Sequence, residues 1–416
     1  MERYSTYKDS GVSWIGEIPE HWALRRVKYI FSELKEKSEN GLEKPLSLSK
    51  DGGIIPFNEK KNRTMESASY VGGKIVHKGE IVFNRFKARL FAVSAYDGIV
   101  SSDYAVYECN KTASPEYMVK LFGIDIYRDA FNRKASGIGD GFSRLYTDDL
   151  FAMYSIFPPL AEQEKIVSYL ENKTSKIDAY VADNEKEIEL LQELKQKTIA
   201  DAVTKGLNPD AKMKDSGISW IGEIPEYWEV KKIGSLFVER REKVSDKEFP
   251  ALSVSKQGVT PQLDTAVKTD NGDNRKKVCK HDFVVNSRSD RKGSCGVSPY
   301  TGSVSLINIV LSPRENIEVQ YFHHLFRSNN YIEEYYRIGR GIVADLWTTR
   351  YSEMRNIFVP LPPSNEQQAI VAYIEEKCEK IDKLVSELQS EIDYLKEYKQ
   401  RLIADCVTGK VNVQNL

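Results

Sequence analysis

Asp9-Ser-Gly-Val-Ser-Trp14-Ile-Gly-Glu-Ile-Pro19-Glu-His-Trp22 occurs a second time in this chain, as Asp215-Ser-Gly-Ile-Ser-Trp220-Ile-Gly-Glu-Ile-Pro225-Glu-Tyr-Trp228. Only Val12/Ile218 and His21/Tyr227 differ between the two copies of this duplicated stretch, and four of the five tryptophans lie in them. The offset from Asp9 to Asp215 is 206 residues in a chain of 416. The sequence therefore predicts two related halves.

The composition indicates an ordinary globular protein. Hydrophobic residues make up 41% and charged residues 29%, and 416 residues suffice for two to four domains. No apolar run approaches the roughly 20 residues of a membrane span, and the N-terminal residues lack the apolar core of a signal peptide. The five cysteines are scattered without a CxxC pair, which favours reduced thiols and a cytoplasmic location. The net charge of −1 weakens a nucleic-acid function but does not exclude one, because positive charge can be confined to one face.

Each copy of the duplicated stretch is followed by short runs of β-branched and aromatic residues between Gly, Asp and Asn turns, for example 80–83 and 104–107. This pattern predicts β-rich domains, with helices over 115–133. Because Trp, Ile and Pro dominate the duplicated stretch, we expect it to lie against a core and to perform no chemistry.

Residues 161–203 contain neither proline nor glycine, which predicts one long helix ending at Gly206 and Pro209. Apolar residues in four-and-three spacing form a coiled-coil seam in this helix and in a second one near the C-terminus: Ile177, Val181, Ile188 and Leu191, with Asn184 in the gap, and Ile381, Val385, Leu388, Ile392 and Leu395. We favour antiparallel pairing of the two helices with each other, although such a seam can also dock a foreign helix. Asn184 either sets the register or is an exposed residue.

The predicted fold class is therefore α+β, with two β-rich mixed domains related by an internal repeat and joined by two long helices in an antiparallel coiled coil. The predicted boundaries are 1–160 and 207–363 for the domains, and 161–206 and 364–416 for the helices with the C-terminal tail. Val407-Thr-Gly-Lys-Val-Asn412 matches Val203-Thr-Lys-Gly-Leu-Asn208, which leads straight into a domain. We therefore expect the C-terminus to lie near the N-terminus, and the chain to tolerate circular permutation.

The two halves differ most at basic segments in equivalent places, 84–89 and 286–292. Arg and Lys suit phosphate contacts, and Arg and Asn suit bidentate contacts with base edges. The candidate DNA-binding residues are Lys50, Asn84, Arg85, Lys87, Arg89 and Arg144 in the first half, and Lys256, Asn286, Arg288, Arg291, Lys292 and Arg340 in the second. The alternative for either segment is an ordinary solvated loop.

The sequence predicts no catalytic residue and no metal site. The glycines of 137–141 lack the lysine of a phosphate-binding loop, and Pro209-Asp210 lacks the Glu-x-Lys of a nuclease. Cys279, His281, His323 and His324 match no zinc spacing. Motifs of serine hydrolases, zinc proteases and amino-methyltransferases do not occur, so the chain is predicted to perform no reaction alone.

Three features carry a resemblance to a known family: Trp14–Pro19 with Trp220–Pro225, Pro158-Pro159…Glu162-Gln163 with Pro362-Pro363…Glu366-Gln367, and the two long helices. In these the chain resembles the specificity subunit of type I restriction-modification enzymes. The resemblance implies two target-recognition domains, each reading one half of a bipartite asymmetric DNA site, while the helices set the spacer and dock two methyltransferase (modification) subunits.

The resemblance also implies the partners and cofactors. Double-stranded DNA and the methyltransferase subunits would bind this chain, and restriction-translocase subunits would join the full complex. S-adenosylmethionine, ATP and magnesium would act on the partner subunits, with no cofactor on this chain and no membrane partner. A non-catalytic pseudo-symmetric scaffold for protein or glycan partners is the alternative. A DNA-binding assay would distinguish the DNA-recognition function from the scaffold function.

Overall fold

The computed structural model describes residues 2–49, 53–60, 69–86, 90–137, 143–262, 272–314, 317–341 and 347–414. They form two compact units, Met1–Asn184 with Ser390–Leu416, and Glu185–Gln389. Each unit contains one globular domain and a segment of both long helices, α4 (Leu160–Lys205) and α9 (Ser364–Val407). The predicted domain boundaries thus fall near the ends of the helices, whereas the compact units divide the chain within them.

The duplicated stretch opens each domain as a short antiparallel hairpin. Its strands are β1 (Tyr7–Asp9) with β2 (Glu17–Pro19) in unit 1, and β15 (Met213–Asp215) with β16 (Glu223–Pro225) in unit 2. The last tryptophan of each copy, Trp22 or Trp228, is fully buried. Burial of such large side chains stabilises the fold, so the prediction that the duplicated stretch lies against a core is confirmed.

A four-stranded antiparallel sheet forms the centre of each domain, with the same strand order in both. In unit 1 the order is β4 (Phe31–Leu34), β11 (Tyr104–Cys109), β8 (Ile81–Asn84) and β9 (Phe91–Val93). In unit 2 it is β18 (Phe237–Glu239), β26 (Asn308–Pro313), β23 (Phe283–Asn286) and β24 (Cys295–Val297).

Side chains alternate along these strands, so each sheet buries two faces. Val82 and Val106 contribute to one core cluster, together with residues of the outer strands. On β8 the neighbouring Phe83 stacks against Phe91, whose ring lies at 5.2 Å from Phe122 of a helix. The helices covering the sheets are α1 (Pro115–Phe122) and α2 (Asp125–Lys134) in unit 1, and α6 (Val319–Phe326) and α7 (Asn329–Arg337) in unit 2.

Short strands, helices and turns complete both domains. In unit 1 they are β3 (Ala23–Arg26), η1 (Val27–Tyr29), β5 (Leu46–Ser49), β6 (Gly53–Pro56), η2 (Phe57–Glu59), β7 (Lys74–Val76), β10 (Gly98–Val100), β12 (Ser136–Gly137), β13 (Ser143–Arg144), α3 (Thr147–Ala152) and β14 (Tyr154–Phe157). In unit 2 they are β17 (Glu229–Lys232), α5 (Ile233–Leu236), β19 (Lys243–Val244), β20 (Leu252–Ser255), β21 (Gly258–Pro261), β22 (Arg275–Val278), η3 (Ser289–Arg291), β25 (Gly302–Val304), α8 (Tyr351–Met354) and β27 (Phe358–Leu361).

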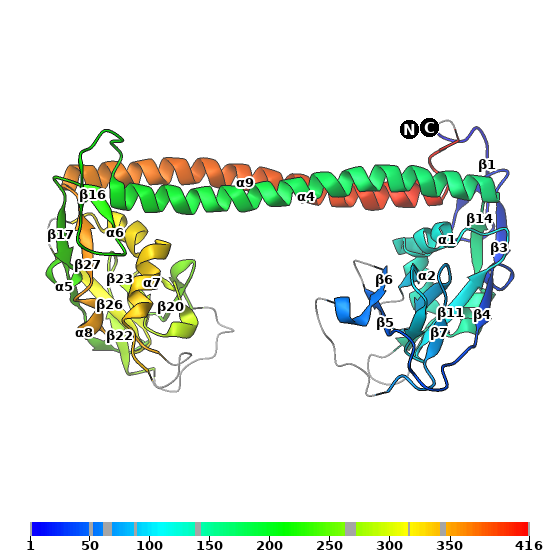
Figure 1. Ribbon diagram of the computed structural model, residues 1–416, viewed down its shortest axis with the longest axis horizontal. Helices are drawn as coiled ribbons and strands as arrows, with labels where there is room; N and C mark the ends of the chain where they lie inside the picture. The colour runs from blue at the N-terminus through cyan, green and yellow to red at the C-terminus, as the bar shows by residue number, and fades with distance from the viewer. Residues whose placement is uncertain are drawn as a thin grey trace. The chain divides into compact units, whose positions relative to one another are not determined.

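Segments of the two long helices lie antiparallel beside each other within each unit (Figure 1). In unit 2 the Lys195 ammonium lies 2.6 Å from the Asp382 carboxylate, and in unit 1 Lys399 lies 2.6 Å from Asp178. Asp178 and Lys195 are the repeat equivalents of Asp382 and Lys399, at an offset of 204 residues. The same ion pair therefore forms in both units with donor and acceptor helices exchanged, and the predicted antiparallel pairing is confirmed.

The C-terminal end of each long helix docks on a domain through one repeated contact. The Tyr321 hydroxyl donates to the carbonyl of Val203 at 2.8 Å, and its equivalent Tyr117 donates to Val407 at 2.8 Å. Beyond Val407, the Asn412 N–H donates to the carbonyl of Glu2 at 2.9 Å. The expectation that the C-terminal residues lie beside the N-terminal ones is confirmed, as Figure 1 also shows.

Candidate nucleic-acid interface

The basic segments begin where the equivalent strands β8 and β23 end. The Oδ1 atoms of Asn84 and Asn286 accept the backbone N–H two residues further on, from Phe86 at 2.9 Å and from Arg288 at 3.2 Å. These local bonds turn the chain out of the sheet. Both asparagine side chains are thereby engaged in the turn, which is the same in the two domains although the residues that follow differ.

Arg85 has a structural partner. Its guanidinium pairs with the Glu33 carboxylate and donates to Thr147 Oγ1 at 3.2 Å, and its side chain is only 12% exposed. Burial raises the pKa of Glu33, but Lys74 and Arg85 outweigh this and hold that pKa below its usual value. Because removing one member of a buried ion pair leaves the other charge uncompensated, we assign Arg85 to the core and withdraw it from the proposed interface.

Arg144 lies on β13, which pairs with β12 through Ser136 opposite Arg144. Its guanidinium carbon lies 5.3 Å from the centre of the Phe86 ring and 5.4 Å from that of Tyr146. Within the described part of the chain, its buried Nε atom has no hydrogen-bond partner. The two rings thus hold a half-buried guanidinium at the surface of the domain.

The second domain gathers more exposed positive charge. Arg288 and Arg291 are 51% and 66% exposed and share the carboxylate of Asp290 at 4.0 and 3.7 Å. Lys292 pairs with Glu333 at 2.5 Å. Arg340 is exposed, and its backbone pairs with Thr348, which also pairs with Arg288. The fold therefore brings Arg288 and Arg340 together, although 52 residues separate them in the sequence.

For four further candidate DNA-binding residues the structure gives little or no information. Lys50, Lys87 and Arg89 lie outside the described residues. Lys256 is exposed at the β20–β21 turn, and its carbonyl accepts a hydrogen bond from the Arg327 guanidinium. All four remain predictions.

No cluster of three or more His, Cys, Asp or Glu residues suited to a metal ion occurs among the described residues. His323 and His324 are both mostly buried. Burial, with Arg327 nearby, lowers the pKa of His323 to about 3 and that of His324 to about 4. His323 Nδ1 accepts the Val297 N–H at 3.2 Å, so this ring contributes to packing.

The predicted seam residues lie on the less exposed side of the long helices. Ile177, Val181, Ile381 and Ile392 are buried, and the other members of the set, including Asn184, are half-buried. The helices also carry exposed large apolar residues that the seam analysis did not include. In unit 1 these are Tyr180, Tyr394 and Tyr398, and in unit 2 they are the repeat equivalents Leu384, Leu190 and Leu194. We call these two sets the helix stripes.

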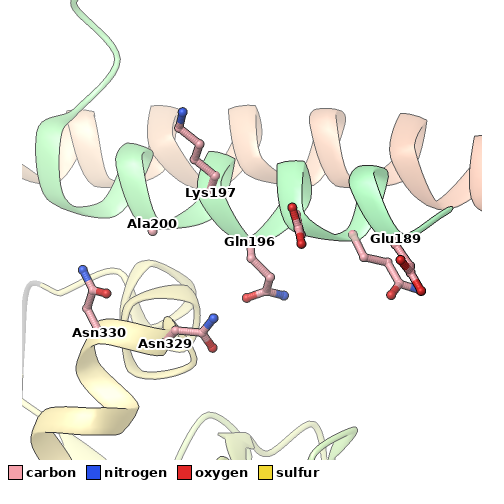
Figure 2. Close-up of a pocket in the computed structure, with 8 residues that line it drawn as sticks. Glu189, Gln196, Lys197, Ala200, Asn329 and Asn330 are labelled. Atoms are coloured by element: carbon pink, nitrogen blue, oxygen red, sulfur yellow. The ribbon is translucent and has the colours of Figure 1, made fainter. Parts of the chain in front are cut away.

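A cleft of about 540 Å³ separates α4 from the start of α7 in unit 2. Figure 2 shows Gln196 of α4 and Asn329 of α7 extending into it. Glu189 and Glu193 also line the cleft. Among the described residues, the two carboxylates outnumber the one lysine of the lining, Lys197, and none of the candidate DNA-binding residues lines this cleft.

Sequence reasoning also missed Phe86, Tyr146, Thr348 and Arg350, which surround the candidate arginines. A comparison of the two halves at the helix offset of 204 residues would have aligned Arg144 with Thr348 and Tyr146 with Arg350. The comparison could not predict which residues lie beside the candidate arginines, because strand pairing in the fold brings these residues together.

Comparison with known proteins supports the resemblance drawn from the sequence. No protein-family model matches the chain. A protein of Methanocaldococcus jannaschii assigned as the type I restriction enzyme MjaX specificity subunit is 25% identical over 96% of both chains. The MjaVIII specificity subunit of that organism is 26% identical over 62% of both chains. The EcoBI specificity subunit of Escherichia coli is 23% identical over 65% of this chain and 60% of its own.

Two solved structures share the fold. A chain from a type I restriction-modification system, described for its complex assembly and conformational transition, has a TM-score of 0.68 and 17% identity over 95% of this chain and 99% of its own. The HsdS subunit from Thermoanaerobacter tengcongensis has a TM-score of 0.53 and 16% identity over 95% and 98%. The resemblance to type I restriction specificity subunits and the α+β fold class are thereby confirmed. The curated relatives are named as specificity subunits and not as methyltransferases or nucleases.

Proposed function

We propose that this chain is the sequence-specific DNA-recognition subunit of a type I restriction-modification complex. Each domain reads one half of a bipartite site, and the long helices set the number of unread base pairs between the halves. The observation that carries the proposal is the duplicated fold with two divergent basic surfaces at equivalent places, in a chain that aligns over 96% of its length with a protein named as a specificity subunit.

The division between shared and divergent parts supports this role. A protein that reads two different half-sites needs one scaffold twice and two different sets of base contacts. The sheets, the docking tyrosines and the helix ion pairs are the repeated scaffold. The surfaces around Arg144 and Arg288 are not repeated.

The helix stripes support docking of two copies of one partner. The Lys399–Asp178 pair shows that Tyr180 lies near the level of Tyr394 and Tyr398, and the rings of Tyr394 and Tyr398 stack with their centres 6.4 Å apart. The equivalent Lys195–Asp382 pair does the same for Leu384, Leu190 and Leu194. Exposed apolar groups at repeated positions favour association with a protein, and we propose methyltransferase subunits as that partner.

S-adenosylmethionine would then belong to the methyltransferase subunits, and ATP and magnesium to restriction-translocase subunits. This chain supplies DNA recognition and positioning. Its place of action would be the cytoplasm, where the DNA substrate lies in a prokaryotic cell.

A gel shift with duplex DNA tests the proposal, using the full-length chain alone and together with the co-expressed methyltransferase subunit. We expect specific binding at least in the joint preparation, with an affinity that falls as salt rises. Absence of DNA binding in both preparations would instead favour a scaffold for protein or glycan.

The partner surface has its own test. Tyr394→Ser with Tyr398→Ser should remove one methyltransferase subunit per chain in native mass spectrometry, and Leu190→Ser with Leu194→Ser the other. Full occupancy in both double variants would refute the helix stripes as docking sites.

A further inference from the structure

The same backbone framework carries different side chains in the two domains near their basic segments. The Leu145 N–H donates to the carbonyl of Arg85 at 3.0 Å, and its equivalent Thr349 donates to Ser287 at 3.0 Å. In unit 1 the bond connects the segment after β8 to the ribbon formed by β12 and β13. In unit 2 it connects the segment after β23 to the equivalent ribbon, in which Arg340 pairs with Thr348. We call the four surface positions on this framework the ribbon patch: Ser136, Arg144, Tyr146 and Phe86 in unit 1, and Arg340, Thr348, Arg350 and Arg288 in unit 2.

The two domains have arginine at different positions of the patch. In unit 1 one arginine, Arg144, lies beside two aromatic rings. In unit 2 the equivalent residue is Thr348, and the backbones of Arg288 and Arg340 flank it on both sides. The exposed Arg350 completes this set. The exchange occurs although two backbone contacts beneath the patch are the same in both domains: the hydrogen bond from Leu145 or Thr349, and the pairing of Ser136 with Arg144 or of Arg340 with Thr348.

The surroundings of Arg144 prepare its guanidinium for one kind of ligand. The Phe86 and Tyr146 rings restrict the side-chain rotamers, which reduces the entropy lost on binding. Its Nε is buried, so the terminal nitrogens are the part of the fork available to a ligand. No ion pair to Arg144 is present in the described part of the chain, in contrast to Arg85, whose partner is Glu33. A guanidinium held in a fixed orientation suits the O6 and N7 acceptors of guanine in the major groove.

We propose that the ribbon patch reads bases in each domain, and that Arg144 contacts a guanine in the half-site of the first domain. This inference rests on the proposed DNA-recognition function. Thr348 cannot make the bidentate contact, so the corresponding position of the second half-site carries a different preference. The alternative role of Arg144 is a purely structural one, in which the rings and the guanidinium fasten the ribbon to the domain.

Selection of bound duplexes from a random-sequence library tests the proposal, with the full-length chain prepared with its co-expressed methyltransferase subunit. Wild-type protein should enrich a motif of two separated blocks. Arg144→Lys keeps the charge and loses the planar fork. It should abolish the preference for one G·C pair in one block and leave the other block unchanged. The affinity for the wild-type motif should fall about 5- to 150-fold, as for one bidentate base contact.

Arg26→Lys is the matched control. Arg26 also lies over a tyrosine ring, 5.3 Å from the centre of Tyr154, but it is exposed and belongs to β3, outside the patch. Its substitution should leave both blocks unchanged. Arg144→Met is the second variant, because its unbranched apolar side chain can still pack against the rings. It should lose the same base preference while retaining the melting temperature within a few degrees.

The outcomes separate the two proposals. An unchanged motif for folded Arg144→Lys and Arg144→Met overturns the assignment while the recognition function stands. Equal weakening on all sequences makes Arg144 a phosphate contact and also overturns it. If the wild-type preparation enriches no motif, the recognition function itself fails.

Discussion

The two units share their framework and differ at the surfaces assigned to DNA. The tyrosine at each helix docking site, the strand order and the helix ion pair recur at equivalent positions. At the ribbon patch, unit 1 has Arg144 with two aromatic rings. At the equivalent positions unit 2 has Thr348 with three arginines. The comparison teaches that the chemistry diverges most where side chains leave the core, as expected if duplication preserved assembly while recognition changed.

Small differences also exist inside the shared framework. The glutamate at the start of each long helix, which is buried at Glu162 and half-buried at Glu366, has different partners in the two units. In unit 1 Glu162 accepts from the Tyr4 hydroxyl and contacts His21 Nε2 at 2.9 Å. In unit 2 Glu366 accepts from Trp228 Nε1 at 3.0 Å and Tyr227 at 3.1 Å. These differences allow matched experiments in which one unit is the control for the other.

The largest effect of a single substitution at neutral pH is expected at the glycines of the helix ends, Gly409 and Gly206, which both have φ near +75°. Both Ala substitutions incur backbone strain of about 1–2 kcal/mol. A Cβ on Gly409 would lie 2.5 Å from the rigid Pro19 ring, whereas on Gly206 it would meet the flexible Glu366 carboxylate at 2.9 Å. We therefore expect Gly409→Ala to cost about 3–4 kcal/mol and Gly206→Ala about 1–2 kcal/mol.

Urea unfolding of the two glycine variants measures this difference. Equal losses in both would show that the helix ends dock with the same tolerance.

The next effect is a pH dependence specific to unit 2. His323 and His324 have folded-state pKa values of about 3 and 4, against 6.5 when exposed, because burial, Arg327 and, for His324, Lys195 disfavour the protonated ring. Below pH 6.5 the unfolded chain binds protons that the folded chain does not. The free energy of unfolding is therefore unaffected by these two histidines above pH 6.5. Below that pH it falls by about 1.4 kcal/mol per pH unit for each histidine.

The double variant His323→Gln/His324→Gln tests this effect, since glutamine can still accept the Val297 N–H. Between pH 6.5 and 4.5 its free energy of unfolding should fall less steeply than that of the wild type. Parallel pH profiles would contradict the assigned shifts. Unit 1 has Val119 and Lys120 at these positions and lacks this source of acid sensitivity.

A smaller effect is expected for the last tryptophan of the duplicated stretch. Trp228→Phe removes the bond from Nε1 to the Glu366 carboxylate, a charge-assisted contribution of about 2 kcal/mol. Trp22 Nε1 is buried without a hydrogen-bond partner among the described residues. Trp22→Phe should thus cost only the lost packing, about 1 kcal/mol. Chemical denaturation of both variants checks the order, and a costlier Trp22→Phe would contradict it.

The smallest effect should be the same in both units. Asp178→Asn and Asp382→Asn each remove one exposed helix ion pair of 2.6 Å. Surface ion pairs contribute about 0.2–1 kcal/mol, with weaker effects at high salt. Thermal melts of the two variants should coincide within error. Clearly different melting temperatures would show that the repeated pair is not energetically equivalent.

Period and repetition made much of this fold predictable. Four-and-three spacing predicted the paired helices, and the repeat of residues 203–208 at 407–412 predicted the contact between the chain ends, because both signals are local in sequence. The candidate interface was predicted only in part. The role of Arg85 depends on Glu33, which the fold brings from 52 residues away. The setting of Arg144 depends on Phe86, from another strand end. The charge of a residue alone does not distinguish an arginine in a buried ion pair from an arginine that contacts bases.

Methylation mapping in the source cell tests the central claim most directly, with methylated adenines sequenced genome-wide with and without the gene for this chain. A split motif with a fixed unread spacer should be methylated in the parent and unmethylated in the deletion strain. Restoring the chain with Arg144→Lys should relax only one half of that motif. Methylation that is unchanged by the deletion, or confined to a single uninterrupted motif, would contradict recognition of two half-sites by the two domains.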